Sequence, residues 1–249
     1  MSDYQQLLHN FEQLGLHRMK EYFPNYLELM NNQSIPFTEA FLELTNQELL
    51  YKDEKKIERA LKKARFPKIK RMMDFDFGYQ PSINKQQVLD LQHLSFLDKQ
   101  ENLLFIGSPG VGKSHLATST GICACKQGVR TLFINCHELL LRLQSAYENN
   151  TIERVMKRYA NYDLLIIDEI GYLPIHRQEA DLLFQLINAR YERHSTIFTT
   201  NSPLSNWSEI FRNPTATAAI LDRLVHHSQI FKITGKSYRL RDHQESIQK

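Results

Sequence analysis

The eight residues Gly107-Ser108-Pro109-Gly110-Val111-Gly112-Lys113-Ser114 form a complete G-x-x-x-x-G-K-S phosphate-binding loop. The apolar run 103–106 precedes this loop as an expected buried strand, and residues 115–118 follow it as a first helical turn. In this strand, loop and helix context, backbone N–H groups and the helix N-terminus bind a phosphate anion. The alternative, a chance glycine turn, leaves the Lys and Ser at their fixed positions unexplained.

Two side chains of the loop are expected to do chemistry. Lys113 can reach the β and γ phosphates of a nucleotide, and the Ser114 hydroxyl can hold Mg²⁺. The predicted nucleotide-binding residues are Gly107, Ser108, Pro109, Gly110, Val111, Gly112, Lys113, Ser114 and His115.

A second apolar run, 164–167, ends in the carboxylates Asp168 and Glu169. Its run of aliphatic residues is typical of a strand covered on both faces, and open α/β sheets bind ligands at the carboxyl ends of such strands. Asp168 is therefore predicted to orient Mg²⁺ through water, and Glu169 to act as general base on the attacking water. The alternative is an acidic pair that caps the next turn.

Two further segments follow in the order expected of an ATPase. The β-branched strand 196–200 ends at Asn201, which can reach between the γ-phosphate and the water held by Glu169. The helical pattern 219–224 carries Arg223, a candidate arginine finger. Taken alone, Asn201 is an ordinary turn residue and Arg223 an ordinary surface residue.

Together these motifs resemble the AAA+ ATPases of the initiator and helicase-loader clade. Within that clade the chain is most similar to the IstB family, the transposition helper ATPases of insertion sequences, because of the stretches 170–174, 179–187, 190–193, 226–228 and 237–241. The resemblance implies ATP and Mg²⁺ as cofactors. It also implies a homo-oligomer with ATP at subunit interfaces, Arg223 acting on a neighbour's γ-phosphate, and double-stranded DNA and a transposase of the same element as partners.

Strand and helix patterns alternate through the second half of the chain, which predicts an α/β fold with a parallel sheet flanked by helices. The expected strands are 103–106, 129–135, 163–168, 196–200 and 229–233; the expected helices lie within 113–126, 137–160, 178–193 and 215–225. We expect a helical N-terminal domain at 1–66, a linker at 67–100 and an AAA+ core at 101–249. Because the sequence ends soon after residue 241, we expect no full C-terminal lid.

The N-terminal segment is predicted to be helical. Thr45-Asn-Gln-Glu48 matches a capping box and is expected to open a long helix whose inward face includes Leu49, Leu50, Ile57, Leu61 and Ala64. The stretch 52–71 is strongly basic, with ten Lys or Arg residues against three Asp or Glu residues. We interpret it as a DNA-phosphate surface rather than a solvated face, with contacts from Lys55, Lys56, Arg59, Lys62, Lys63 and Arg65.

Composition limits the class of protein and the compartment in which it works. Hydrophobic residues make up 42% and charged residues 24% of the 249 residues, which is ordinary for a globular protein. No apolar run is long enough to span a bilayer, and the start of the chain lacks the pattern of a secretory signal. The three cysteines show no metal-binding spacing, so we expect free thiols in a reducing cytoplasm. The pair His226-His227 is expected to be helix-end surface or packing.

Two other functions remain open. A DnaC-like loader of a replicative helicase would share the ATPase motifs, but would use its N-terminal segment to bind the helicase. A small-molecule P-loop kinase is disfavoured by the absence of a lid and by the Asp-Glu strand end. Arg239 has no assured role, and the aromatic residues Phe75, Phe77 and Tyr79 are either near the adenine or in the core.

Overall fold

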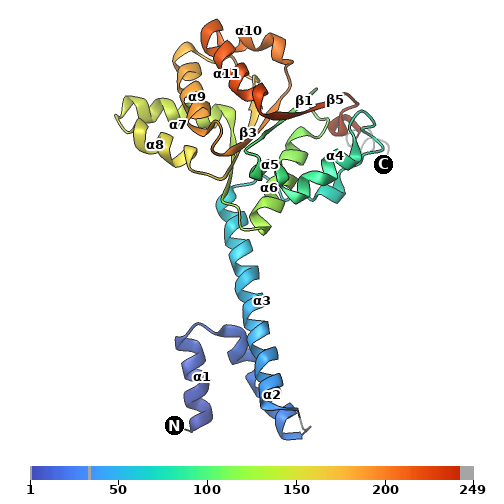
Figure 1. Cartoon of the computed structure of the whole chain (residues 1–249), viewed down its shortest axis with the longest axis vertical. Helices are drawn as coiled ribbons and strands as arrows, with labels where there is room; N and C mark the ends of the chain where they lie inside the picture. The colour runs from blue at the N-terminus through green and yellow to red at the C-terminus, as the bar shows by residue number, and fades with distance from the viewer. Residues whose placement is uncertain (1, 33–34, 242–249) are drawn as a thin grey trace. The chain divides into compact units, whose positions relative to one another are not determined.

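The computed structural model describes residues 2–32 and 35–241 (Figure 1). The contacts between residues divide the chain into two compact units, Met1–Arg59 and Ala60–Lys249. None of the helices in the described residues has the length and apolar character needed to cross a membrane.

The first unit is helical. It contains α1 (Asp3–Gln13), α2 (His17–Asn32) and most of α3 (Phe37–Ala64), whose last residues belong to the second unit. Phe11, Met19 and Leu44 form its small buried core. The Ser2 hydroxyl caps α1 by accepting a hydrogen bond from the Gln5 N–H at 3.3 Å.

The predicted capping box at Thr45 is wrong. α3 begins at Phe37, immediately after Pro36, so Thr45 lies inside the helix and its hydroxyl donates to the Leu42 carbonyl at 2.8 Å. Glu48 instead caps a different helix: its carboxylate accepts the N–H groups of Arg18 and Met19 in the first turn of α2, at 2.7 and 3.1 Å.

The predicted inward face of α3 is wrong in part. Leu49 and Leu50 are each 60% exposed, whereas Ile57 and Leu61 are half-buried and Ala64 is buried. The helix starts earlier than the capping box implies, and only a short stretch of it, around Leu44 and Glu48, packs on α1 and α2. Leu49 and Leu50, which come next along α3, remain at the surface.

The second unit is built on a five-stranded, all-parallel sheet in the order β2-β3-β4-β1-β5. Its strands are β1 (Asn102–Gly107), β2 (Thr131–Asn135), β3 (Leu164–Ile170), β4 (Ser195–Thr200) and β5 (Ser228–Ile233). Each predicted strand is present, with ends that differ by a residue or two. The α/β fold predicted from the sequence is confirmed.

Helices cover both faces of the sheet (Figure 1). One face is covered by α6 (Lys113–Lys126), with the short helices η1 (Met72–Asp74), α4 (Lys85–Asp90), η2 (Leu91–His93) and α5 (Ser95–Asp98) beside it. The other is covered by α7 (Cys136–Glu148), α8 (Ile152–Ala160), α9 (Arg177–Arg190), η3 (Leu204–Asn206), α10 (Trp207–Phe211) and α11 (Pro214–His226).

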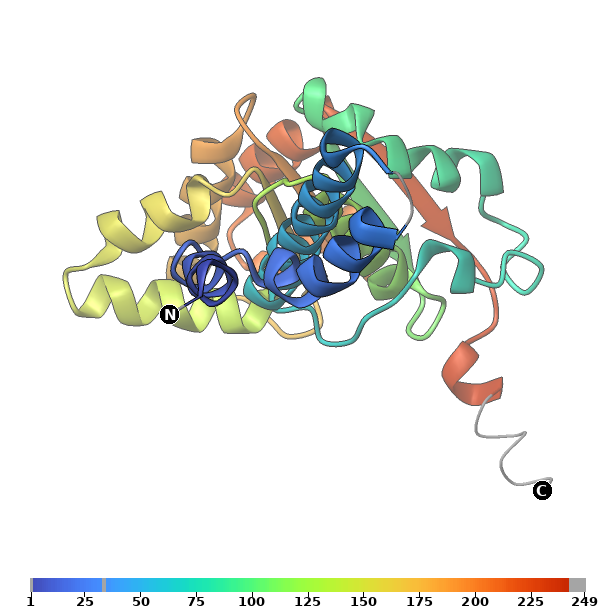
Figure 2. The ribbon, with the colours of Figure 1, turned by 90° about the horizontal axis from the view of Figure 1, so that it is seen from below.

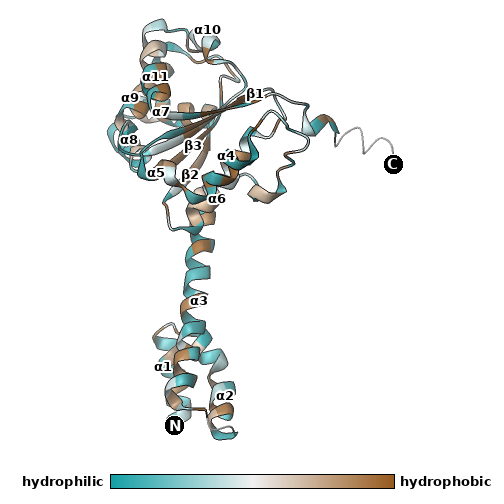
Figure 3. Cartoon of the chain, turned by 45° about the vertical axis from the view of Figure 1, so that its right-hand side comes forward, coloured by the Kyte–Doolittle hydropathy of each residue, from teal (hydrophilic) through white to brown (hydrophobic). Residues whose placement is uncertain are grey.

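Alternate strand residues face the two helical layers. Leu104, Ile167 and Phe198 join the core on the α7–α9–α11 side, while Leu103 and Phe105 join the core on the α6 side. This two-faced burial accounts for the unbroken apolar strands in the sequence, and Figure 3 shows these strands as the hydrophobic interior of the unit. The α7–α8 pair and β5 lie at opposite ends of the sheet (Figure 2).

Candidate functional site

The phosphate-binding loop joins β1, which lies between β4 and β5 in the sheet, to α6. Gly110 and Gly112 have φ values of 81° and 102°, a region that residues with a Cβ rarely adopt. A Cβ on Gly112 would also lie 2.5 Å from the ring of Phe75. Both glycines are therefore required for this loop to form against its neighbours.

Lys113 opens α6 and is only 8% exposed. Its Nζ donates to the carbonyls of Gly107 and Ser108 at 2.7 and 2.9 Å, so the ammonium lies inside the curve of the loop. Burial lowers the pKa of Lys113, and the carboxylates of Asp168 and Glu169 oppose that shift.

A buried hydrogen-bond cluster joins α6, β3 and β4. Ser114 Oγ donates to the two oxygens of Asp168 at 2.8 and 3.0 Å, and Thr199 Oγ1 donates to Asp168 Oδ1 at 2.6 Å. Asp168 is 6% exposed, and burial raises its pKa; the bonds from Thr199 and Ser114 act in the opposite direction. The structure thus brings together Ser114 and Asp168, the two predicted metal-binding residues.

Glu169 sits in an irregularity of β3. The pairing of β3 with β4 shifts register between Ile167 and Ile170, and Glu169 has a φ of 63°. This turns the Glu169 side chain out to an exposed position while Asp168 stays buried. The Glu169 N–H donates to Thr199 Oγ1 at 2.9 Å, and its carboxylate accepts from Asn135 Nδ2 at 2.9 Å.

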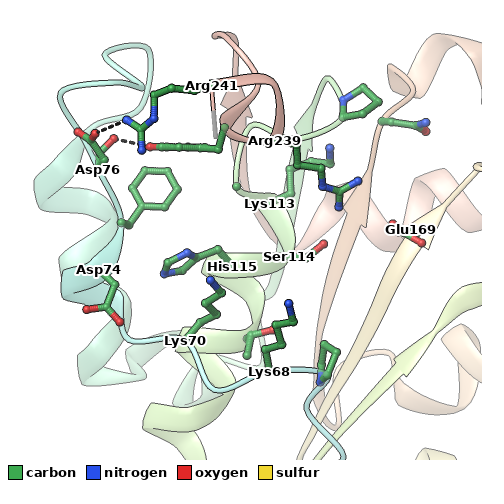
Figure 4. A pocket seen from close by; sticks show the side chains of 18 of the residues that line it. Lys68, Lys70, Asp74, Asp76, Lys113, Ser114, His115, Glu169, Arg239 and Arg241 are labelled. Atoms are coloured by element: carbon green, nitrogen blue, oxygen red, sulfur yellow. Dashed lines mark hydrogen bonds and ion pairs between the residues drawn. The ribbon is translucent and has the colours of Figure 1, made fainter. Parts of the chain in front are cut away.

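Lys113, Ser114 and Glu169 open onto one cavity of about 600 Å³. Figure 4 shows Lys113, Ser114, Glu169 and Arg239 around it. Its lining comprises Pro67, Lys68, Lys70, Asp74, Phe75, Asp76, Pro109, Gly110, Gly112, Lys113, Ser114, His115, Thr118, Glu169, Tyr172, Asn201, Tyr238, Arg239 and Arg241. Asn201 and Arg239 therefore both reach the cavity.

The segment after β5 closes one side of the cavity. The Tyr238 N–H donates to the Gly110 carbonyl at 3.0 Å, and Arg241 pairs with Asp76 at 3.2 Å (Figure 4). The Arg241 guanidinium also stacks over the rings of Tyr79 and Tyr238. Burial raises the pKa of Tyr238 to about 12. In the described residues no helical lid follows β5.

Arg223 is not among the residues that line the cavity. It lies on α11, where its Nε donates to Asn188 Oδ1 of α9 at 2.8 Å and its guanidinium packs over the ring of Phe184. The basic residues of α3 and Arg65, which follows it, are also outside the cavity. Lys55 pairs with Glu58 at 2.7 Å, and the cationic residues 56, 59, 62, 63 and 65 are exposed.

Several residues in or beside the site were not singled out by the sequence. Thr199 and Asn135 bond the two acidic residues, yet each looks like an ordinary end-of-strand residue in the sequence. Lys68 and Lys70 line the cavity, although in the sequence they merely continue the basic run of α3. The strand-end positions of Thr199 and Asn135 were the available signal, since all carboxyl ends of a parallel sheet meet at one edge.

Solved structures share this fold. AMPPCP-bound DnaA from Aquifex aeolicus matches with a TM-score of 0.57 at 17% identity, over 74% of this chain and 56% of that one. DnaI matches with a TM-score of 0.57 at 18% identity, over 71% of this chain and 94% of that one. At this identity the likeness establishes the AAA+ fold alone.

Sequence comparison also identifies the family. The chain is 47% identical over 242 residues to an IS232 putative ATP-binding protein of Bacillus thuringiensis subsp. berliner, covering 97% of each chain. It is 38% identical to an IS21 putative ATP-binding protein of Pseudomonas aeruginosa, over 92% of this chain and 86% of that one. The sequence model of IstB-like ATP binding proteins matches residues 9–246, so the chain belongs to the IstB-like family of insertion-sequence ATP-binding proteins.

Proposed function

We propose that this chain is a cytoplasmic ATPase that binds double-stranded DNA and regulates or recruits the transposase encoded by the same insertion sequence. The observation that carries the ATPase part is the cluster of Ser114, Asp168 and Thr199 beside Glu169, directly next to the phosphate-binding loop. The family, and relatives named as insertion-sequence ATP-binding proteins, support the transposition part.

The donor set fits Mg²⁺. The Ser114 hydroxyl and the Asp168 carboxylate are hard oxygen ligands 2.8 Å apart, at the edge of a cavity large enough for a nucleotide. When bound there, Mg²⁺ would neutralise charge on the β and γ phosphate oxygens.

The protein's own groups supply the other steps of hydrolysis. Lys113 Nζ exchanges its loop carbonyl partners for phosphate oxygens, and its low exposure strengthens that attraction. Glu169 accepts the proton of the attacking water, and Asn201 donates a hydrogen bond that orients this water or the γ-phosphate. The products are ADP and phosphate, and turnover serves to regulate assembly.

A second subunit completes the site in this proposal. Arg223 does not line the cavity of its own chain, as expected of a residue that acts on the nucleotide of a neighbouring subunit. We propose a homo-oligomer with ATP at each interface, in which Arg223 exchanges Asn188 for the neighbour's γ-phosphate.

Two substitutions test the ATPase proposal. Lys113→Ala should abolish ATP binding, because the phosphates lose their principal counter-charge. Glu169→Gln should bind ATP normally but hydrolyse it at least a hundredfold more slowly, because an amide cannot accept the proton. Nucleotide affinity and phosphate release measure the two effects; normal turnover in Glu169→Gln would remove Glu169 from the mechanism.

The DNA proposal rests on six basic residues in the last turns of α3 and just after it, all exposed except the half-buried Lys55: Lys55, Lys56, Arg59, Lys62, Lys63 and Arg65. Replacing Lys56, Arg59 and Lys63 by Gln should keep the helix and flatten the slope of log affinity against log salt by about one per lost contact. A matched variant removes three exposed lysines elsewhere, Lys99, Lys126 and Lys232. Equal slopes and affinities in both variants would refute a phosphate surface on α3 and favour a DnaC-like loader.

A further inference from the structure

Three potential metal ligands meet where α9 and α11 end. Glu192 follows α9, His226 is the last residue of α11, and His227 comes next. One ring nitrogen from each histidine and one carboxylate oxygen of Glu192 all lie within 4.8 Å of one another. Within residues 2–32 and 35–241 no other group of His, Cys, Asp or Glu has this geometry.

Contacts around the cluster hold its members in place. His227 Nε2 lies 3.2 Å from Glu192 Oε1, and the two imidazole rings are 4.1 Å apart at 71°. Tyr191 Oη lies 2.9 Å from His226 Nδ1, and that partner fixes the orientation of the ring. The His227 carbonyl accepts the Asn102 N–H at 2.7 Å, which anchors this turn to the start of β1.

We propose that Glu192, His226 and His227 form a binding site for Zn²⁺ or a similar divalent transition metal. Two imidazoles and one carboxylate are ligands that suit Zn²⁺, with a fourth position open to water. Tetrahedral ligands at about 2.1 Å from the metal lie about 3.4 Å apart, so atoms already within 4.8 Å need only side-chain rotation. The side chains of His227 and Glu192 are 40% and 57% exposed, so a metal ion can enter from solvent.

The metal would tie α11 to the chain just after α9. Arg223 lies one helical turn before His226 on α11 and bonds Asn188 of α9. A bound ion therefore adds a further link between α11 and the chain after α9, beside the Tyr191–His226 and Glu192–His227 contacts. The role is structural, because none of the three ligands lines the nucleotide cavity.

Calorimetric titration of the tag-free full-length protein with Zn²⁺, without nucleotide, tests the site. We expect one ion per chain, and at a hundredfold excess over Kd a rise in Tm of about 5 °C. His226→Ala, His227→Ala and Glu192→Gln should each weaken binding at least tenfold. His137→Ala, which removes an exposed histidine elsewhere, should bind as the wild type does.

A second variant tests the geometry without removing a ligand. Tyr191→Phe keeps all three ligands and loses the hydroxyl beside His226, so Zn²⁺ affinity should fall about tenfold. The Tm measured without metal shows whether each variant folds. Glu192→Gln changes only an exposed side chain, so this variant still tests the site if a histidine variant unfolds. Absence of stoichiometric binding by the wild type, or equal affinity in Glu192→Gln, would overturn the site and leave an ordinary Glu192–His227 ion pair.

Discussion

Replacing Thr199 by Val removes one buried hydroxyl while keeping the shape of the side chain. Thr199 is fully buried; its hydroxyl donates to Asp168 at 2.6 Å and accepts the Glu169 N–H at 2.9 Å. The substitution therefore removes a hydrogen bond to a carboxylate and leaves a backbone donor without its partner. The similar volume of Val means that no cavity forms.

The expected cost follows from those two bonds. A hydrogen bond to a charged group contributes about 1.5–3 kcal/mol, and an unsatisfied buried donor costs about 1–3 kcal/mol. We expect the free energy of unfolding to fall by about 3 kcal/mol, which lowers Tm by about 6–12 °C in a domain of this size. Thr199→Ser keeps the hydroxyl and should lose about 1 kcal/mol or less.

The cost should also depend on pH. Burial raises the pKa of Asp168, and the bond from Thr199 opposes that shift, so Thr199→Val raises this pKa further. A carboxyl group whose folded pKa exceeds its unfolded pKa loses stability as pH rises through the interval between them. The penalty should therefore be largest at neutral pH and smaller in acid, where Asp168 is protonated.

Urea unfolding of wild type, Thr199→Val and Thr199→Ser at several pH values measures both effects. Mg²⁺-dependent ATP binding by Thr199→Val should also decline at a higher pH than in the wild type, since protons compete with the metal for Asp168. Equal stability and equal pH profiles for Val and Ser would refute the assigned role of the Thr199 hydroxyl.

Three other changes probe separate parts of the chain. Asn135→Asp keeps an oxygen that caps α7 but loses the N–H that donates to Glu169. We expect Tm to stay within about 1 °C and ATP hydrolysis to fall at least tenfold. Unchanged hydrolysis would exclude a role of Asn135 in positioning Glu169. Arg223→Ala should bind ATP but not hydrolyse it. Mixing it with Lys113→Ala should restore activity, because one variant keeps the ATP site and the other keeps Arg223. No recovery in mixed assemblies would argue against a site shared between subunits. Glu48→Gln should destabilise the first unit by about 2 kcal/mol, measured as faster amide exchange in α1 and α2.

The nucleotide side of the molecule was predictable because local sequence determines it. A strand, a glycine loop and a helix occupy consecutive residues, and this local order fixes the positions of Lys113 and Ser114 at the start of the helix. Asp168 and Glu169 were equally clear, since the end of an apolar strand fixes their position on the sheet. What the sequence did not indicate is the register irregularity that buries Asp168 and exposes Glu169. It arises from pairing with β4, which lies far along the chain.

The N-terminal errors have a related physical cause. A Ser/Thr-x-x-Glu pattern identifies a helix start only when the chain before it is not helical. Residues 37–44 are helical, which makes Thr45 an interior residue and releases Glu48 to bond another helix. The partner of Glu48 is the first turn of α2, about thirty residues earlier, and no local pattern shows that contact. Long-range polar contacts of this kind, including those of Thr199 and Asn135, accounted for most of what sequence reasoning missed.

Asn135 shows how one side chain can join several parts of the site. It is the last residue of β2, in register with Asp168 of β3. Its Oδ1 accepts the His137 N–H in the first turn of α7 at 2.9 Å, while its Nδ2 donates to the Glu169 carboxylate. Rotation of the first turn of α7 must therefore either break the cap or carry the Asn135 amide with it. Because the same amide bonds Glu169, the proposed general base, we expect a change at the start of α7 to affect the proposed ATP hydrolysis through these two hydrogen bonds, without altering the phosphate-binding loop.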